Sequence, residues 1–281
     1  MSPRRILLSS PFLRSSPTAK GSTLLFALVC LCLQLPGHPL AAQDTPLLLD
    51  PEIRDLLHES LSGEQAKEYA IAISRFHRIQ GSRGYRESGH YVLDVLREAG
   101  FDEAQAFIES FPSDGIREYQ TWQSPSGWDI ERGELRMVEP FEERIAGYPE
   151  IAMSVMTYSN PGHARGELVW VGPGTSPSDY EGKDVAGKIV LCTGYGGDVH
   201  RLAVLEYGAE AVVCYLDDER AMEFPDMLAY TGMWPKAHEL ERVRFGFNLT
   251  RRQGERLRKL LEAGERVVLD ATVEGIGLEP Y

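Results

Sequence analysis

The sequence lacks the short motifs that mark common hydrolytic sites. His58 and His238 are each followed by Glu, but neither has a second His four positions on, so the His-Glu-x-x-His zinc motif is absent. No His-x-Asp pair occurs, and no Gly-x-Ser-x-Gly marks a nucleophilic serine. We therefore expect no catalytic residue, no metal ligand and no cofactor in this chain.

Positive charge is also scarce. The 281 residues hold 29 Lys and Arg against 42 Asp and Glu, a net charge of −13. Residues 1–42 contain four of the basic residues and no acidic one, so the other 239 residues carry 25 basic and 42 acidic side chains. This balance excludes a nucleic-acid partner that relies on overall positive charge.

Cysteine is rare as well. Only Cys192 and Cys214 follow residue 42, which excludes a disulfide-dense scaffold. Both lie within apolar runs and have no basic neighbour in sequence, a poor setting for a thiolate nucleophile. Two interpretations remain open for the pair, a disulfide and two buried thiols.

Long apolar runs are missing too. The longest begins at Leu24 and ends at Leu35, after Arg4 and Arg5 and before Pro36. It is shorter than the roughly 20 residues that span a bilayer. The pattern predicts an export signal over residues 1–42, hence a secreted or periplasmic protein with no stable membrane span after signal removal. An uncleaved anchor is the alternative.

The first part of the remaining chain has helical periodicity. Ser62 and Gln65 have capping-box spacing before a helix predicted over 64–77, and a second helix, with Val92 and Leu96 inward, should end at Gly100. The run 106–111 (AFIESF) predicts a strand, and 112–150 suggests short strands.

The second part alternates strands and helices. Strands are predicted at 167–172, 188–192, 210–216, 243–248 and 266–273. A helix capped by Asp198 and ended by Gly208 would connect two of them in a βαβ unit, and Thr250 with Gln253 would cap another. Nothing structured is expected after Val273. The fold class is therefore α/β, mixed α+β.

Two further motifs suggest sites. Asn248-Leu249-Thr250 is a possible glycosylation sequon, although a capping Thr explains it equally well. Gly194-Tyr195-Gly196-Gly197 follows a strand, as in a dinucleotide site, but Val199 stands where that fingerprint needs glycine. A glycine-rich joint in the βαβ unit is the favoured interpretation.

Two regions together resemble a known family. The segment Tyr69–Phe111, with FHRIQGSRGYRESGHYVLDVLREAGF and AFIESF, is similar to the opening of secreted zinc-dependent exopeptidases of the aminopeptidase and glutamate-carboxypeptidase type. The segment Arg165–Val273, with KDVAGKIVL and YGAEA, resembles the protease-associated domain that many of these enzymes insert after that opening.

The resemblance implies a domain plan. It predicts a signal peptide over 1–42, an N-terminal segment of a split peptidase-like domain over 43–160, a protease-associated domain with a βαβ core over 161–275, and a truncated tail over 276–281. In that family the zinc ligands and the general base lie downstream of the inserted domain, so no catalytic residue has a counterpart here, and zinc is expected only in a full-length parent.

These expectations lead to two functional hypotheses. The first is a fragment of a secreted zinc aminopeptidase-like protein, catalytically silent by itself, whose protease-associated domain restricts access of substrate or partner. The second is a self-standing exported module that binds a peptide or protein. Whether the protein is an enzyme is left open.

Overall fold

A computed structural model describes residues 48–281. The predicted export signal lies outside the described residues. None of the helices within 48–281 has the length and apolar content needed to cross a membrane. The chain divides into two compact units, one ending at Gly63 and one beginning at Glu64. The described part of the first unit contains α2 (Pro51–Ser60), whose start is capped by Asp50 accepting from the Glu52 N–H at 2.8 Å.

The second unit opens with two helices, α3 (Gly63–Ser74) and α4 (Arg83–Glu98). The Ser82 hydroxyl caps α4 by accepting from the Tyr85 N–H at 3.2 Å, and Gly100 follows the helix with a positive φ of 95°. Both helices end close to their predicted positions. We call residues 64–122 the helical segment. It also contains β1 (Glu118–Tyr119) and the first residue of β2 (Trp122–Gln123), and these two strands pair as a short hairpin.

The turn between α3 and α4 packs against the start of β3. Gly81 has φ +73°, and a Cβ there would lie 2.9 Å from the Gly127 Cα, so only glycine fits. The Gly81 carbonyl accepts from the Trp128 N–H at 2.9 Å, and the Asp129 carboxylate accepts from the Arg83 N–H at 3.2 Å. These two hydrogen bonds hold the turn at Gly81 and the start of α4 against β3.

Residues 127–281, here called the sheet body, are organised around one sheet with strand order β5-β4-β10-β6-β7-β8-β9. Strands β6 to β9 run parallel, whereas β10 is antiparallel to both β4 and β6. The strands are β3 (Gly127–Asp129), β4 (Arg132–Glu139), β5 (Glu143–Tyr148), β6 (Gly162–Trp170), β7 (Ile189–Cys192), β8 (Ala211–Tyr215), β9 (Phe245–Leu249), β10 (Val268–Glu274) and β11 (Gly277–Glu279).

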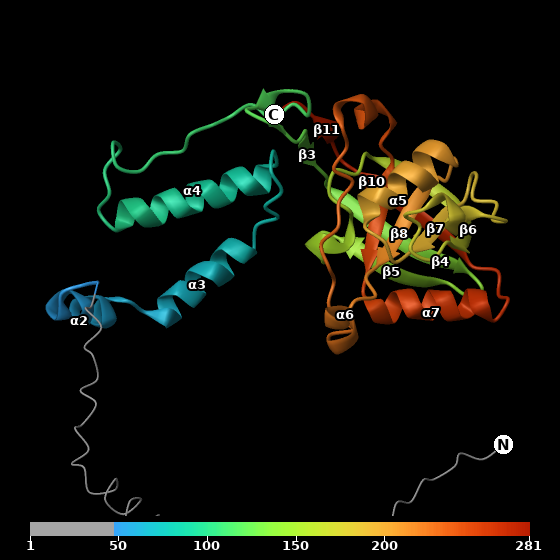
Figure 1. Ribbon diagram of the computed structural model, residues 1–281, viewed down its shortest axis with the longest axis horizontal. Coiled ribbons are helices and arrows are strands. Elements are labelled where there is room, and N and C mark those ends of the chain that lie inside the picture. The colour runs from blue at the N-terminus through green and yellow to red at the C-terminus, as the bar shows by residue number, and fades with distance from the viewer. Residues whose placement is uncertain (1–47) are drawn as a thin grey trace, which may run out of the picture. The chain divides into compact units, whose positions relative to one another are not determined.

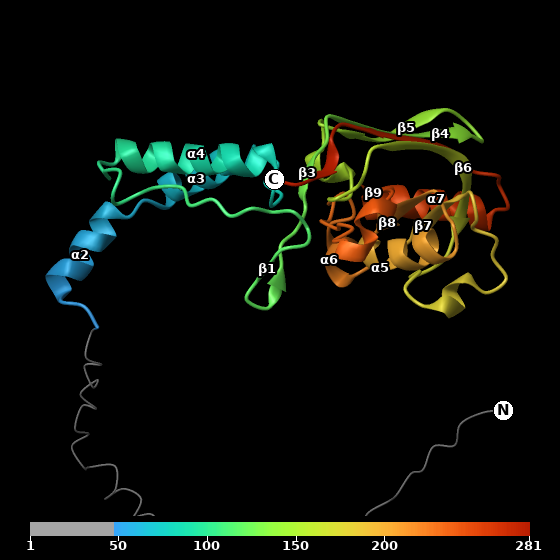
Figure 2. The same ribbon diagram turned by 90° about the horizontal axis from the view of Figure 1, so that it is seen from above.

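Helices cover the parallel strands. Strand β8 lies between α5 and α7 in two perpendicular views (Figures 1 and 2), and α7 approaches closely because Gly254 lies directly against Tyr215. The helices of the sheet body are η1 (Ala152–Ser154), η2 (Pro177–Tyr180), α5 (Gly196–His200), its π-helical continuation η3 (Arg201–Glu206), α6 (Glu219–Glu223), η4 (Ala237–Arg242) and α7 (Arg251–Glu262).

The mixed α/β class is confirmed, and so is the βαβ unit of β7, α5–η3 and β8. The Thr250–Gln253 capping box of α7 is present as predicted. Strands β4 and β5 precede residue 160 and lie in the same sheet as the strands that follow it. The predicted boundary therefore does not separate two sheets.

Three local predictions were wrong. Residues 106–111 form no strand, because no segment within 48–281 pairs with them. The residues after β10 are structured, since β11 pairs with β3 and the Tyr281 N–H donates to the Ser113 carbonyl at 3.0 Å. Asp198 does not cap α5. The cap is Tyr195, and the helix begins at Gly196, three residues earlier than predicted.

Candidate binding surface

The two cysteines of the sequence analysis lie side by side in the core. Cys192 on β7 and Cys214 on β8 are partners in the parallel ladder, and both are free and buried. Burial raises the pKa of Cys192, and a hydrogen bond with Cys214 raises it further. Neither thiol is suited to act as a nucleophile in the folded chain.

The Asn248 sequon is not presented to solvent. Asn248 lies on β9 with 2% of its surface exposed. Its amide donates to the Met153 carbonyl at 3.0 Å, and its Oδ1 accepts from the Thr231 hydroxyl at 2.6 Å. In the folded chain, the amide nitrogen that a glycan would modify is thus buried and hydrogen-bonded. Thr250 caps α7 instead.

The glycine cluster before α5 serves close packing. A Cβ at Gly196 would lie 2.6 Å from the Met156 Sδ, and one at Gly197 would lie 2.6 Å from the Met233 carbonyl. The start of α5 is thus covered by protein atoms. A pyrophosphate, which a dinucleotide site must admit here, has no space.

Three partly exposed aromatic residues gather beside the start of α5. Tyr195, Tyr230 and Trp234 form what we call the aromatic surface; the two tyrosines have 38% and 40% of their surface exposed. The Gly232 amide and the Trp234 indole hydrogen-bond to the Tyr195 phenol. The Thr157 hydroxyl donates to the Tyr230 hydroxyl at 3.1 Å. Burial raises the pKa of Tyr195, and the Tyr230 phenol adds to the shift, so Tyr195 stays a neutral donor.

The backbone beneath this surface is strained. Tyr158 and Trp234 have positive φ values of 62° and 42°, which bulky side chains rarely adopt. Their ring centroids are 4.8 Å apart, and Tyr158 is fully buried. Such residues cost on the order of 1–3 kcal/mol each and concentrate at functional sites.

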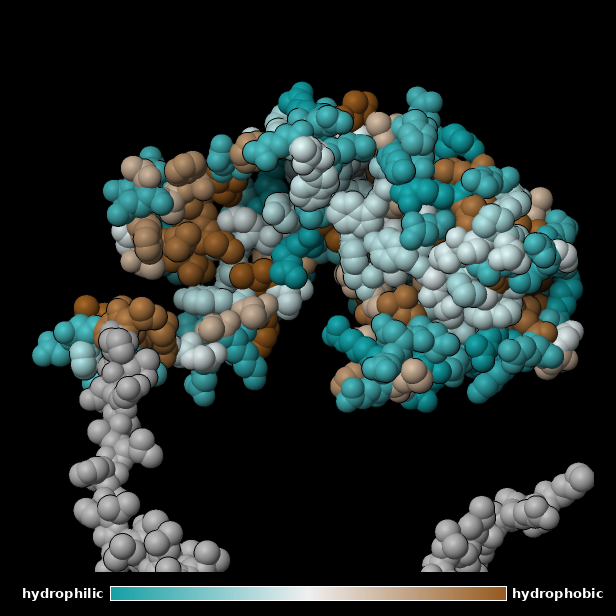
Figure 3. All heavy atoms as spheres, viewed as in Figure 1, coloured by the Kyte–Doolittle hydropathy of each residue, from teal (hydrophilic) through white to brown (hydrophobic). Residues whose placement is uncertain are grey.

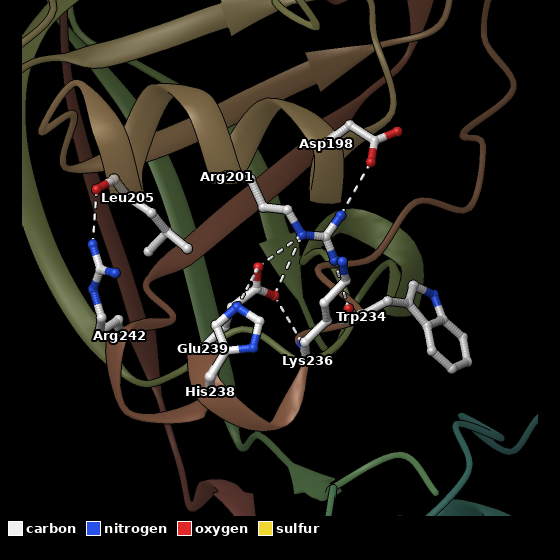
Figure 4. Close-up of polar contacts among 8 residues, drawn as sticks. All are labelled: Asp198, Arg201, Leu205, Trp234, Lys236, His238, Glu239 and Arg242. Atoms are coloured by element: carbon white, nitrogen blue, oxygen red, sulfur yellow. Dashed lines mark hydrogen bonds and ion pairs between the residues drawn. The ribbon is translucent and has the colours of Figure 1, made fainter. Parts of the chain in front are cut away.

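Arg201 holds the strained loop against η3 (Figure 4). Its guanidinium donates to the Trp234 carbonyl at 2.9 Å, to the Glu239 carboxylate at 3.0 Å and to Asp198 at 3.1 Å. Burial raises the pKa of Glu239, but the Lys236 N–H and Arg201 together outweigh it, so the pKa is lowered overall. Glu239 therefore stays charged and the loop stays tied to η3.

The residue before Arg201 is a buried histidine. His200 has 3% of its surface exposed, and its Nε2 accepts from the Arg244 N–H at 3.1 Å. Burial lowers its pKa to about 4, against a smaller opposing effect of Glu239. His200 is thus a neutral acceptor that holds the chain entering β9.

The described residues do not fit a zinc site. Within 48–281 no three His, Cys, Asp or Glu side chains are close enough to hold a metal ion together. His163 has a single carboxylate neighbour, Asp270, at 3.0 Å, and the His200 nitrogen is occupied by Arg244. A catalytic zinc needs three protein ligands and an open position, which residues 48–281 do not supply.

Partly exposed aromatic faces can bury apolar side chains, and phenol hydroxyls can bond to peptide groups, whereas the Trp234 indole is already bonded to the Tyr195 phenol. Sequence reasoning missed Tyr230, Trp234 and Arg201, because they come from separate elements. The sequence did contain one indication of this surface. Tyr195 lies inside the glycine cluster whose close packing brings the strained loop to it.

No protein-family model and no curated protein matches the chain. Solved structures do. The chain is similar over 82% of its length to a peptidase M28 precursor from Shewanella amazonensis SB2B, with a TM-score of 0.53, 13% identity and 51% of that chain covered. An aminopeptidase from Aneurinibacillus sp. strain AM-1 is also similar, with a TM-score of 0.47 and 21% identity over 80% of this chain and 46% of that one. BSAP, a zinc aminopeptidase from Bacillus subtilis, has a TM-score of 0.46 and 15% identity over 76% of this chain and 45% of its own.

The chain spans about half the length of these structures. The likeness to the Shewanella peptidase, at a TM-score above 0.5, shows a peptidase-related fold.

Proposed function

We propose that this chain is the helical opening and the protease-associated domain of a secreted zinc aminopeptidase-like peptide hydrolase, and that it is catalytically silent by itself. Zinc and its ligands belong to a part of the parent that lies outside these 281 residues. The protease-associated domain restricts which peptide or protein reaches the parent's active site, and the aromatic surface is where it contacts that peptide.

The observation that carries this proposal is the exposure of the helical segment. Within residues 64–122, only Ile79 and Ala106 are buried hydrophobic residues. Apolar side chains lie on the surface of α4 (brown in Figure 3), and Phe107, Ile108 and Phe111 are 41–68% exposed. Contiguous apolar surface of this kind marks an interface. The missing half of a peptidase fold would cover it.

A solubility comparison tests the proposal. The purified full chain should self-associate, and a double variant with Val92→Glu and Phe107→Glu should be monomeric by light scattering. The matched control carries Met222→Glu and Phe224→Glu, which replace equally exposed apolar residues of α6 in the sheet body. A monomeric unmodified chain, or an equal effect of the control, would contradict the proposal.

Metal and activity provide the second test. The purified chain should hold no stoichiometric zinc and should not hydrolyse aminoacyl substrates. The coding sequence after Tyr281 should contain a His-x-Asp in an open frame. Tightly bound zinc or aminopeptidase activity in the 281-residue chain would refute the proposal.

The second candidate is a self-standing exported module that binds a peptide or protein. The tied tail favours it: β11 pairs with β3, and the Arg86 guanidinium lies 4.6 Å from the centre of the Tyr281 ring. A module should be monomeric in solution and should bind peptides with a change in Trp234 fluorescence that the Trp234→Leu variant loses. A stop codon after Tyr281 with no peptidase frame nearby would favour this candidate.

A further inference from the structure

The two thiols of the sheet body are aligned across neighbouring strands. Cys192 ends β7, and its ladder partner on β8 is Cys214. Registered residues of adjacent parallel strands point to the same face, and the strands are about 4.8 Å apart. A disulfide needs Cα atoms roughly 4.4–6.8 Å apart. At this spacing, the pair falls within the Cα separation that a disulfide needs.

The sulfur atoms also reach toward each other's strand. The Cys192 thiol donates to the Val213 carbonyl of β8 at 3.6 Å, and the Cys214 thiol donates to the Gly194 carbonyl just after β7 at 3.0 Å. The two side chains are themselves hydrogen-bond neighbours. Both have at most 1% of their surface exposed. No metal ligand set includes them within residues 48–281.

We propose that Cys192 and Cys214 are a redox pair that closes to a disulfide between β7 and β8 when the chain folds in the presence of a disulfide oxidant. One thiolate attacks a small-molecule or protein disulfide, R–S–S–R, and releases R–SH. The second thiolate then attacks the mixed disulfide and releases the second R–SH. Two thiol protons pass to the two leaving thiolates, so the chain loses two protons and two electrons, which reduce R–S–S–R to two R–SH.

Burial determines when the reaction takes place. In the folded chain the thiols are shielded from an oxidant, and burial raises the pKa of Cys192 and so depletes the reactive thiolate. The thiol–disulfide exchange therefore takes place before β7 and β8 are buried in the folded sheet. Once closed, the bond links the two strands that flank the crossover α5–η3, which carries Arg201 and begins at Tyr195. It thus stabilises the base of the aromatic surface.

Peptide mapping tests the proposal directly. Trypsin places the cysteines on separate peptides, 189–201 and 202–220, and Cys30 and Cys32 fall on a third. The denatured, reduced full chain is refolded with oxidised glutathione, alkylated in denaturant and digested. We expect the first two peptides to be joined until a reductant is added. Two alkylated peptides, or a bond to Cys30 or Cys32, would overturn the proposal.

The timing and the stabilisation have their own tests. The same oxidant added after folding in reductant should join the peptides far more slowly, and equal rates would overturn the proposed order.

Oxidation should raise Tm by roughly 5–10 °C, since the bond closes a loop of more than 20 residues. The double variant Cys192→Ala, Cys214→Ala should have the same Tm with and without reductant. The proposal is independent of the peptidase hypothesis, because none of these outcomes depends on zinc or on substrate.

Discussion

The helical segment and the sheet body use apolar residues in opposite ways. The sheet body buries them: Leu135, Phe245, Phe247 and Leu257 have 0–1% of their surface exposed. The helical segment exposes them, although α4 is amphipathic and well capped. Local sequence rules can thus form a helix without giving it a core. A capped, periodic helix still needs a partner surface, and the segment meets the sheet body through the turn at Gly81 and through contacts with Tyr281 at the end of the chain.

The largest expected effect compares one residue type in both regions. Phe247→Ala should lower the free energy of unfolding by about 3–5 kcal/mol, because it leaves a cavity in the core. Phe107→Ala, at a position 68% exposed, should change it by less than about 0.5 kcal/mol. Urea unfolding of the two variants measures both. Similar losses would show that the helical segment is buried in solution.

Acid should weaken the sheet body through His200. Its pKa is about 4 when folded and about 6.5 when unfolded, so the unfolded chain takes up the proton first as the pH falls. The stability is fully present above about pH 6.5 and should fall by about 3 kcal/mol down to about pH 4. The groups around His200 that act on it are Glu239, Arg201, Arg242 and Arg244.

The variant His200→Gln isolates this effect. Glutamine can still accept from the Arg244 N–H but does not titrate. Urea unfolding measured from pH 7 to pH 4 should show a flatter profile for the variant than for the unmodified chain. Parallel profiles would show that other groups cause the acid loss.

Arg201→Met should cost about 2 kcal/mol, because it removes the guanidinium that donates to the Trp234 carbonyl and leaves the buried Glu239 carboxylate with the Lys236 N–H but no charged partner of comparable reach. The control is Arg252→Met, whose partner Asp226 is 70% exposed and whose loss should be within about 0.5 kcal/mol. Thermal unfolding compares them, and Trp234 fluorescence should change only in the first. Equal losses would mean that the loop is held by other contacts.

The smallest effect concerns helix caps. Ser82→Ala and Thr250→Ala each remove a side-chain cap and should each cost about 1 kcal/mol. The two variants should differ in the region that loses stability. Ser82→Ala should speed hydrogen exchange in α4 alone, whereas Thr250→Ala should lower the stability of the whole sheet body. Faster exchange throughout the sheet body in the Ser82 variant would contradict independent stability of the two regions.

Sequence reasoning succeeded where information is local. Helical periodicity predicted α3, α4 and α7, and apolar runs predicted β6 to β10. The spacing of Thr250 and Gln253 predicted the cap of α7. These features depend on neighbouring residues only. The zinc-exopeptidase resemblance agrees with the peptidase-related fold.

What failed depended on distant partners. The run 106–111 has strand-forming residues but no pairing segment within 48–281, and no local rule reports that. The apolar content of the tail did not reveal that β11 pairs with β3, about 150 residues earlier. The aromatic surface likewise combines Tyr195, Tyr230 and Trp234 through strained backbone that periodicity cannot detect.

The place of β10 in the sheet has a kinetic consequence. β10 lies between β4 and β6, and without Val268–Glu274 these strands have no common partner. The sheet can close only after a loop of about 130 residues between β4 and β10 is brought together, a slow step in folding. Strands β4 and β6 therefore join one sheet only when β10, far from β4 in the sequence, is in place between them.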